Sequence, residues 1–77
     1  MKKKPTKELQ KLRQMAGLGQ FEVHEKTGIE RSRLSLIECG HVEARPEELS
    51  RIMGVIRAAH RRQVEEFERI AGSAEAA

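Results

Sequence analysis

The chain has 77 residues, of which 38% are hydrophobic, 35% charged and 3% aromatic, and its formal net charge is +3. This length gives one small domain, because a second would have no core of its own, and it argues against an enzyme with a deep pocket. One cysteine excludes an intramolecular disulfide framework and a four-cysteine zinc site. No apolar run approaches the roughly 20 residues that span a bilayer. We therefore expect a soluble, cytoplasmic protein with no secretory signal and no membrane partner.

The positive charge is concentrated at the N-terminus. Residues 1–13 contain six lysines and arginines against one glutamate, whereas residues 14–29, 30–45 and 46–77 are each close to neutral. A basic arm of this kind contacts the phosphates of a nucleic acid, or it is a solvated tail that keeps the protein soluble. Charge alone does not decide between these two interpretations.

The hydrophobic pattern predicts an all-α protein, because no long segment alternates with a period of two and β-branched residues are sparse. The first three helices are each expected to end at a glycine, which adopts a left-handed cap without a Cβ penalty. In chain order they run from Thr6 to Gly17, over about residues 19–27 before Gly28, and over about residues 30–39 before Gly40. Phe21 and Val23 are the expected apolar anchors of the second helix.

A fourth helix is expected to begin at Pro46, since proline suits the first helical position. Neither proline nor glycine interrupts residues 55–71. The pattern fits one long helix, or two helices that meet at a bend near residues 57–61. We expect residues 72–77 to form a flexible tail.

The segment 20–40 carries the functional signal. Its two short helices are separated by a turn at Gly28, which must accept a positive φ, and this arrangement is typical of a helix-turn-helix. The positions expected to face inward are apolar, namely Val23, Ile29, Leu34 and Ile37. The positions expected to face outward are polar, namely Arg31, Ser32, Arg33 and Ser35. Outward side chains of such a helix reach base edges in the major groove of DNA.

An ordered set of residues extends this pattern: Arg13, Gly17-Leu18-Gly19-Gln20, Val23, Gly28-Ile29, Leu34-Ser35, Ile37-Glu38, Gly40, Pro46, Leu49 and Ile52. The set resembles the phage repressor and Cro-like, or XRE-type, helix-turn-helix regulators over about residues 7–56. The resemblance implies a compact four- to five-helix bundle of the lambda-repressor-like DNA-binding type, with a long C-terminal helix. We therefore divide the chain into a domain of residues 1–56, which includes the basic arm, and a helical extension of residues 57–71.

The resemblance also implies roles at the matched positions. The expected base contacts come from the recognition helix and are Arg31, Ser32, Arg33, Ser35 and Leu36. Arg31 is the first candidate for a base reader and Arg33 the second, because a bidentate arginine–guanine pair is the commonest specific contact. The expected phosphate contacts are Arg13, Gln20, Cys39 and His41. Glu38 is expected to be structural, by pairing with Arg13 or by capping local backbone.

Five positions depart from the family's pattern, and one of them is Gly19, which replaces a more usual Ser or Thr cap. His24 stands where a small residue is usual, and Thr27 where a larger apolar residue is common. Glu30 places a carboxylate at the front of the recognition helix, where it repels a phosphate. Leu36 is apolar where a polar reader is frequent, so it contacts a thymine methyl or marks a protein-binding surface.

The extension of residues 57–71 needs something to cover its apolar face. We expect it to pair two copies of the chain through Val64, Phe67 and Ile70. The resulting homodimer would fit two DNA half-sites about 34 Å apart.

We expect a homodimeric transcriptional regulator, a repressor or Cro-like switch, that binds a double-stranded DNA operator with its recognition helix. Two alternatives stay open. One is an antitoxin that also masks a toxin through its last helix, and the other is a protein-interaction module with the same fold that has lost DNA binding. No paired carboxylates, phosphate loop or nucleophile with a base is visible, so we expect no enzyme, no cofactor and no metal site.

Overall fold

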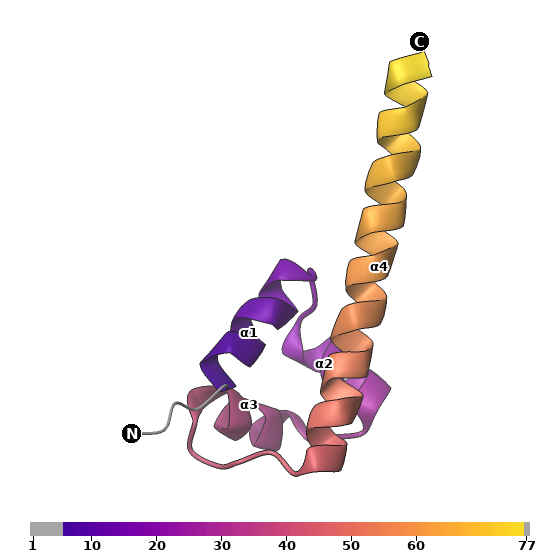
Figure 1. The fold of residues 1–77 in the computed structure, drawn as a ribbon. Coiled ribbons are helices and arrows are strands. Elements are labelled where there is room, and N and C mark those ends of the chain that lie inside the picture. Colours follow the sequence, from indigo (N-terminus) through magenta and orange to yellow (C-terminus); the bar gives the residue numbers. More distant parts are fainter. Residues whose placement is uncertain (1–5, 77) are drawn as a thin grey trace.

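The computed structural model describes residues 6–76, which form four helices and no strand (Figure 1). In chain order these are α1 (Thr6–Met15), α2 (Gln20–Thr27), α3 (Arg31–Cys39) and α4 (Pro46–Ala76). The prediction of an all-α chain is confirmed for this part of the sequence. Lys2, Lys3 and Lys4 of the predicted basic arm lie outside the described residues, as does Ala77 of the predicted tail.

Helices α1, α2 and α3 gather around the first half of α4 and bury a small apolar core between them (Figure 1). The core residues are Leu9, Ala16, Leu18, Val23, Ile29, Leu34, Ile37, Ile52, Ile56 and Ala59. All four residues predicted to face inward across the turn are among them. The apolar period alone therefore located the inner faces of α2 and α3.

Phe21 was predicted to anchor α2, and this is wrong because 53% of its surface is exposed. The buried positions of α2 are Val23 and Thr27, which are four residues apart and lie on one face. Phe21 precedes Val23 by two residues, so it projects to the other side of the helix.

The predicted helix ends are confirmed. Gly17, Gly28 and Gly40 have φ angles of 75°, 80° and 85°, and each follows a helix. At Gly28, the amide donates to the carbonyl of His24 at 2.8 Å, which closes the last turn of α2. A residue with a side chain would be strained in this left-handed conformation.

Helix α4 is continuous over 31 residues, so the alternative with a bend near residues 57–61 is wrong. The predicted flexible tail is also wrong for residues 72–76, which extend the helix. Gly72 costs the helix only about 1 kcal/mol, and the alanines and glutamate that follow it are good helix formers. The last contact of α4 with α1 is the hydrogen bond from Gln63 to the Met15 carbonyl, and beyond it α4 leaves the other helices. Apart from the half-buried Ala71, the described side chains after Ala59 are exposed (Figure 1).

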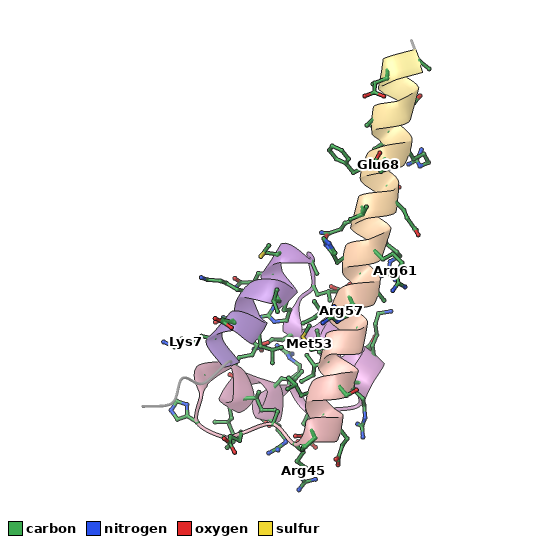
Figure 2. The ribbon with its side chains drawn as sticks, viewed as in Figure 1. Lys7, Arg45, Met53, Arg57, Arg61 and Glu68 are labelled. Carbon is green, nitrogen blue, oxygen red and sulfur yellow. The ribbon has the colours of Figure 1, made fainter. Side chains whose placement is uncertain are left out.

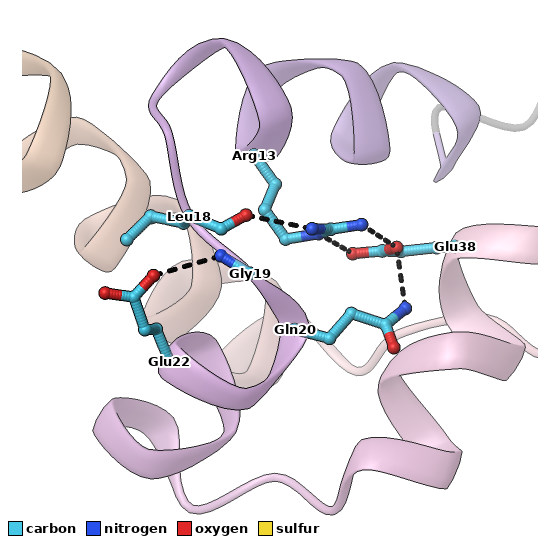
Figure 3. A network of polar contacts seen from close by, with 6 residues as sticks. All are labelled: Arg13, Leu18, Gly19, Gln20, Glu22 and Glu38. Atoms are coloured by element: carbon cyan, nitrogen blue, oxygen red, sulfur yellow. Dashed lines mark hydrogen bonds and ion pairs between the residues drawn. The ribbon is translucent and has the colours of Figure 1, made fainter.

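A buried polar network joins α1, α2 and α3 (Figure 3). The Arg13 guanidinium donates through Nε to Glu38 Oε2 at 2.7 Å and through Nη2 to Glu38 Oε1 at 2.9 Å. Its Nη1 donates to the Leu18 carbonyl at 2.9 Å, and Gln20 Nε2 donates to Glu38 Oε1 at 3.0 Å. Arg13 and Glu38 are both buried, so the predicted pairing of these residues is confirmed.

Replacing Glu38 with alanine should lower the free energy of unfolding by about 3–5 kcal/mol, because the Arg13 guanidinium would stay buried without a counter-charge. A chain of this size has a total of only about 4–12 kcal/mol. Urea denaturation followed by circular dichroism measures the loss. In the double variant Arg13→Met/Glu38→Leu much of it should be recovered, since apolar side chains of similar volume often replace a buried ion pair without cost.

The matched control for this loss is Glu66→Ala, which breaks the exposed ion pair with Arg69. It should cost less than about 1 kcal/mol, because solvent screens such a pair. Equal losses in the Glu38→Ala and Glu66→Ala variants would contradict the importance of the buried network.

Candidate nucleic-acid interface

The α2-turn-α3 unit, residues 20–39, is fixed by side chains inside its own turn. Thr27 Oγ1 donates to the Val23 carbonyl at 2.7 Å and accepts the Ile29 amide at 3.1 Å. His24 Nδ1 lies 2.8 Å from the Ile29 carbonyl, which can only accept, so Nδ1 carries the proton. His24 and Thr27, which the sequence did not assign to any such role, thus satisfy both backbone groups of Ile29.

The unit is also tied to the start of α4. Arg51 Nη1 donates to the Thr27 carbonyl at the end of α2, at 3.2 Å. Arg33 of α3 forms a bidentate ion pair with Glu48, through Nε to Oε2 at 2.6 Å and through Nη2 to Oε1 at 2.8 Å. The last residue of α2 and the first turn of α3 are therefore each bonded to a side chain of α4.

The Arg33 pair corrects one prediction. Arg33 was expected to contact DNA bases, but its guanidinium is already bound to Glu48. The same contact raises the pKa of Arg33, which stays charged. The hydrogen bonds from Arg33 and then from the Arg45 amide hold the pKa of Glu48 at about 2, well below its usual 4.5.

The other predicted base contacts project from α3 to different extents. Arg31 and Ser32 are exposed, Ser35 is half-buried, and Leu36 is 44% exposed. The Arg31 guanidinium carbon lies 5.9 Å from the ring centroid of Phe21, within the range of a cation–π interaction. The exposed ring of Phe21, rather than packing in the core, therefore lies beside the first predicted base reader.

The predicted phosphate contacts divide into buried and exposed residues. Arg13 was expected to approach a phosphate, and this is corrected, because its guanidinium is buried against Glu38 and the Leu18 carbonyl. Gln20 is half-buried and its amide nitrogen donates to Glu38, which leaves one amide hydrogen unused. Cys39 and His41 are exposed at the end of α3.

Two exposed cations lie near these elements: Lys7, which belongs to the predicted basic arm, and Arg45, for which the sequence predicted no role. Figure 2 shows Lys7 on α1 and Arg45 directly before α4, with their side chains projecting from the helical domain. The Arg45 amide donates to Glu48 Oε1 at 2.9 Å, so Arg45 lies close to α3 through the Arg33–Glu48 pair. The spacing Arg45-x-x-Glu48 is that of a residue before a helix and a carboxylate in its first turn, a signal that locates Arg45 at a helix start.

Other kinds of site are not evident in the part of the chain that the structure describes. Within residues 6–76, no three histidine, cysteine or acidic side chains gather where they could hold a metal ion. None of the described helices is both long enough and apolar enough to cross a membrane.

Comparison with known proteins found no relative of this chain: no protein-family model, curated protein or solved structure matches it. The functional assignment therefore depends on the residues and the geometry described above.

Acid should remove the contribution of Glu48 to stability. Its pKa is about 2 in the folded protein, against 4.5 without these contacts, so the unfolded chain binds the proton more tightly. The stabilisation should be complete above about pH 4.5 and should be lost as the pH falls toward about 2. The difference in thermal midpoint between the wild type and Glu48→Gln measures it.

This difference should be largest near neutral pH and should close across that window. Glu47→Gln, at the exposed neighbouring position, controls for the loss of one charge in the first turn of α4. A difference for Glu48→Gln that did not change with pH would contradict the assignment.

Proposed function

We propose that the protein is a sequence-specific regulator of transcription that binds double-stranded DNA, with the lambda-repressor-like helix-turn-helix architecture. The observation that carries the proposal is the exposed face of α3 on a rigidly held unit. Glu38 and Arg33 attach α3 to α1 and α4, while Arg31, Ser32 and Leu36 stay available to a ligand. The major groove of DNA, about 12 Å wide, admits one helix, and these side chains are suited to base edges and thymine methyl groups.

Arg31 is the proposed base reader. The Phe21 ring beside it restricts the long side chain, which reduces the entropy that Arg31 would lose on binding. Its guanidinium would then donate two hydrogen bonds to the O6 and N7 atoms of guanine. Phosphate contacts would come from Gln20, His41, Arg45 and the amides at the start of α2, which fix the register of the protein on the duplex.

The first test is selection from a random pool of double-stranded DNA at low salt, followed by a salt titration of the enriched sequence. A regulator should enrich one motif, and its affinity should fall steeply with salt as arginines and lysines release counterions. A two-fold symmetric motif would indicate that two copies bind together. Failure to enrich any motif, with only weak salt-sensitive binding, would contradict the proposal.

Arg31→Ala and Arg33→Ala should separate recognition from folding. Arg31→Ala should weaken discrimination at one base pair of the motif by about 1–3 kcal/mol without lowering the thermal midpoint. Arg33→Ala should lower the midpoint, because it removes the partner of Glu48, and should leave the base preference of the folded fraction unchanged. Equal effects of both variants on base preference would overturn the assignment of Arg31.

A protein-interaction module is the second candidate. It is favoured by the exposure of Phe21 and Leu36 on the same unit and by the carboxylate of Glu30 at the front of α3. No detectable affinity for DNA at low salt would support it. In the antitoxin form of the first proposal, the exposed half of α4 would bind a toxin.

A further inference from the structure

Helix α4 carries an apolar face that extends beyond the domain. Val64 and Phe67 are 45% and 68% exposed, and they continue the face of Met53, Ile56 and His60 at spacings of three and four residues. Ile70, beside this face, is 54% exposed. The described part of the chain supplies nothing that covers these side chains.

The N-terminal part of the same face borders an apolar groove of about 300 Å³ between α1 and α4. Leu12 and Met15 line it from α1, and Met53, Ile56, Arg57 and His60 line it from α4. Leu12 and Met15 are 39% and 72% exposed, so the groove is open to a ligand. Its volume is sufficient for an aromatic side chain.

The charges of α4 change sign along the helix. Residues 57–62 contain three arginines and no acidic residue, and residues 63–68 contain three glutamates and no basic residue. Arg57, Arg61, Glu65 and Glu68 fall at spacings of three and four, so they line one flank of the apolar face. Figure 2 shows Arg57 and Arg61 on successive turns and Glu68 further toward the tip.

We propose that α4 pairs in antiparallel orientation with α4 of a second copy, and that Phe67 and Ile70 of each copy enter the α1–α4 groove of the other. The proposal concerns a surface remote from α3 and does not depend on DNA binding. Three observations support it: the charges on one flank of α4, the groove that the register set by these charges fills, and the position of α1.

The charges favour the antiparallel direction. A two-fold axis perpendicular to the helices places each flank opposite the same flank of the other copy. Arg57 and Arg61 then face Glu65 and Glu68 of the second copy. In a parallel pair, the two-fold axis runs along the helices, so this flank lies opposite the flank of Gln63 and Ile70, and the arginines do not face the glutamates.

The charge pairs set the register of the two helices, and this register places Phe67 of the second copy in the groove. Placing Arg61 opposite Glu65 and Arg57 opposite Glu68 centres the antiparallel pair near residue 63. Phe67 of the second copy then lies opposite residues 58–59, between Ile56 and His60 of the groove. The side chain with the largest exposed apolar area on the tip of α4 thus meets an apolar groove in the helical domain.

The position of α1 gives Ile70 of the second copy an apolar surface to contact. Gln63 Nε2 donates to the Met15 carbonyl at 3.1 Å, so α1 lies on the Gln63 flank of α4. Ile70 follows Gln63 by seven residues and therefore shares that flank. Because equal flanks face each other in an antiparallel pair, Ile70 of the second copy falls over α1, where Leu12 and Met15 are exposed.

Sedimentation equilibrium of the full chain without DNA tests the pairing. The wild type should be a dimer, and Phe67→Glu and Met15→Glu should each raise the dissociation constant by about 100-fold or more, because each buries an uncompensated charge. Arg61→Glu should also weaken the dimer. Arg62→Glu is its matched control, because Arg62 lies on the opposite side of α4 and should leave association unchanged.

These variants change side chains that are exposed in the single chain, so circular dichroism and the thermal midpoint of the monomer should stay unchanged. A wild type that stays monomeric at millimolar concentration would overturn the proposal. If Met15→Glu did not weaken the dimer, the occupation of the α1–α4 groove would be wrong. If Arg61→Glu and Arg62→Glu had equal effects, the proposed register of the two helices would be wrong.

Disulfide trapping tests the direction. Arg57→Cys and Glu68→Cys are made separately in a Cys39→Ser chain, mixed and oxidised. The antiparallel pair should give mainly the mixed 57–68 disulfide, since the two positions face each other across the interface. Predominance of 57–57 and 68–68 disulfides would show a parallel pair and overturn the proposal. All of these measurements omit DNA, so their outcome is distinguishable from failure of the proposed function.

Discussion

The bidentate ion pair between Arg13 and Glu38 is the constraint on which the small domain depends. Helices of eight to ten residues are not stable alone in water, so α1, α2 and α3 need tertiary contacts to form. Apolar packing tolerates small shifts of one helix against another, whereas two short hydrogen bonds between a fork and a carboxylate do not. The pair therefore sets the position of α3 against α1, and Gln20 extends the same constraint to α2.

A second ion pair holds the other face of α3. Arg33 reaches Glu48 at the start of α4, while Glu38 reaches Arg13 on α1. The charged residues of α3 are thus divided between two tasks. Arg33 and Glu38 fix the helix, and Arg31, whose only described contact is the ring of Phe21, is left to meet a ligand. A rigid support under a few exposed side chains is what an interface requires if it is to discriminate between similar ligands.

The sequence predicted the features that depend on local chemistry. Glycine at Gly17, Gly28 and Gly40 predicted the helix ends, and the apolar period predicted the burial of Val23, Ile29, Leu34 and Ile37. Features that depend on a distant partner were predicted poorly. An arginine on a short helix looks the same in the sequence whether it lies beside an exposed ring, as Arg31 does, or is bound to a carboxylate fifteen residues away, as Arg33 is. The hydrogen bonds of His24 and Thr27 to Ile29 were likewise invisible, because they need the turn to be formed first.

The first half of helix α4 packs against the domain and its second half is exposed. Because the helix is continuous, the direction of each exposed side chain is fixed by its distance in sequence from the packed half. Each residue turns the chain by about 100°. A single insertion between Ala59 and Val64 would leave every core contact in place, yet it would rotate Phe67 away from the direction that Ile56 faces. An insertion of seven or eleven residues would nearly restore that direction. The proposed pairing would therefore tolerate changes in the composition of the exposed part of α4 at many positions, whereas it would restrict changes in length to those that keep this direction.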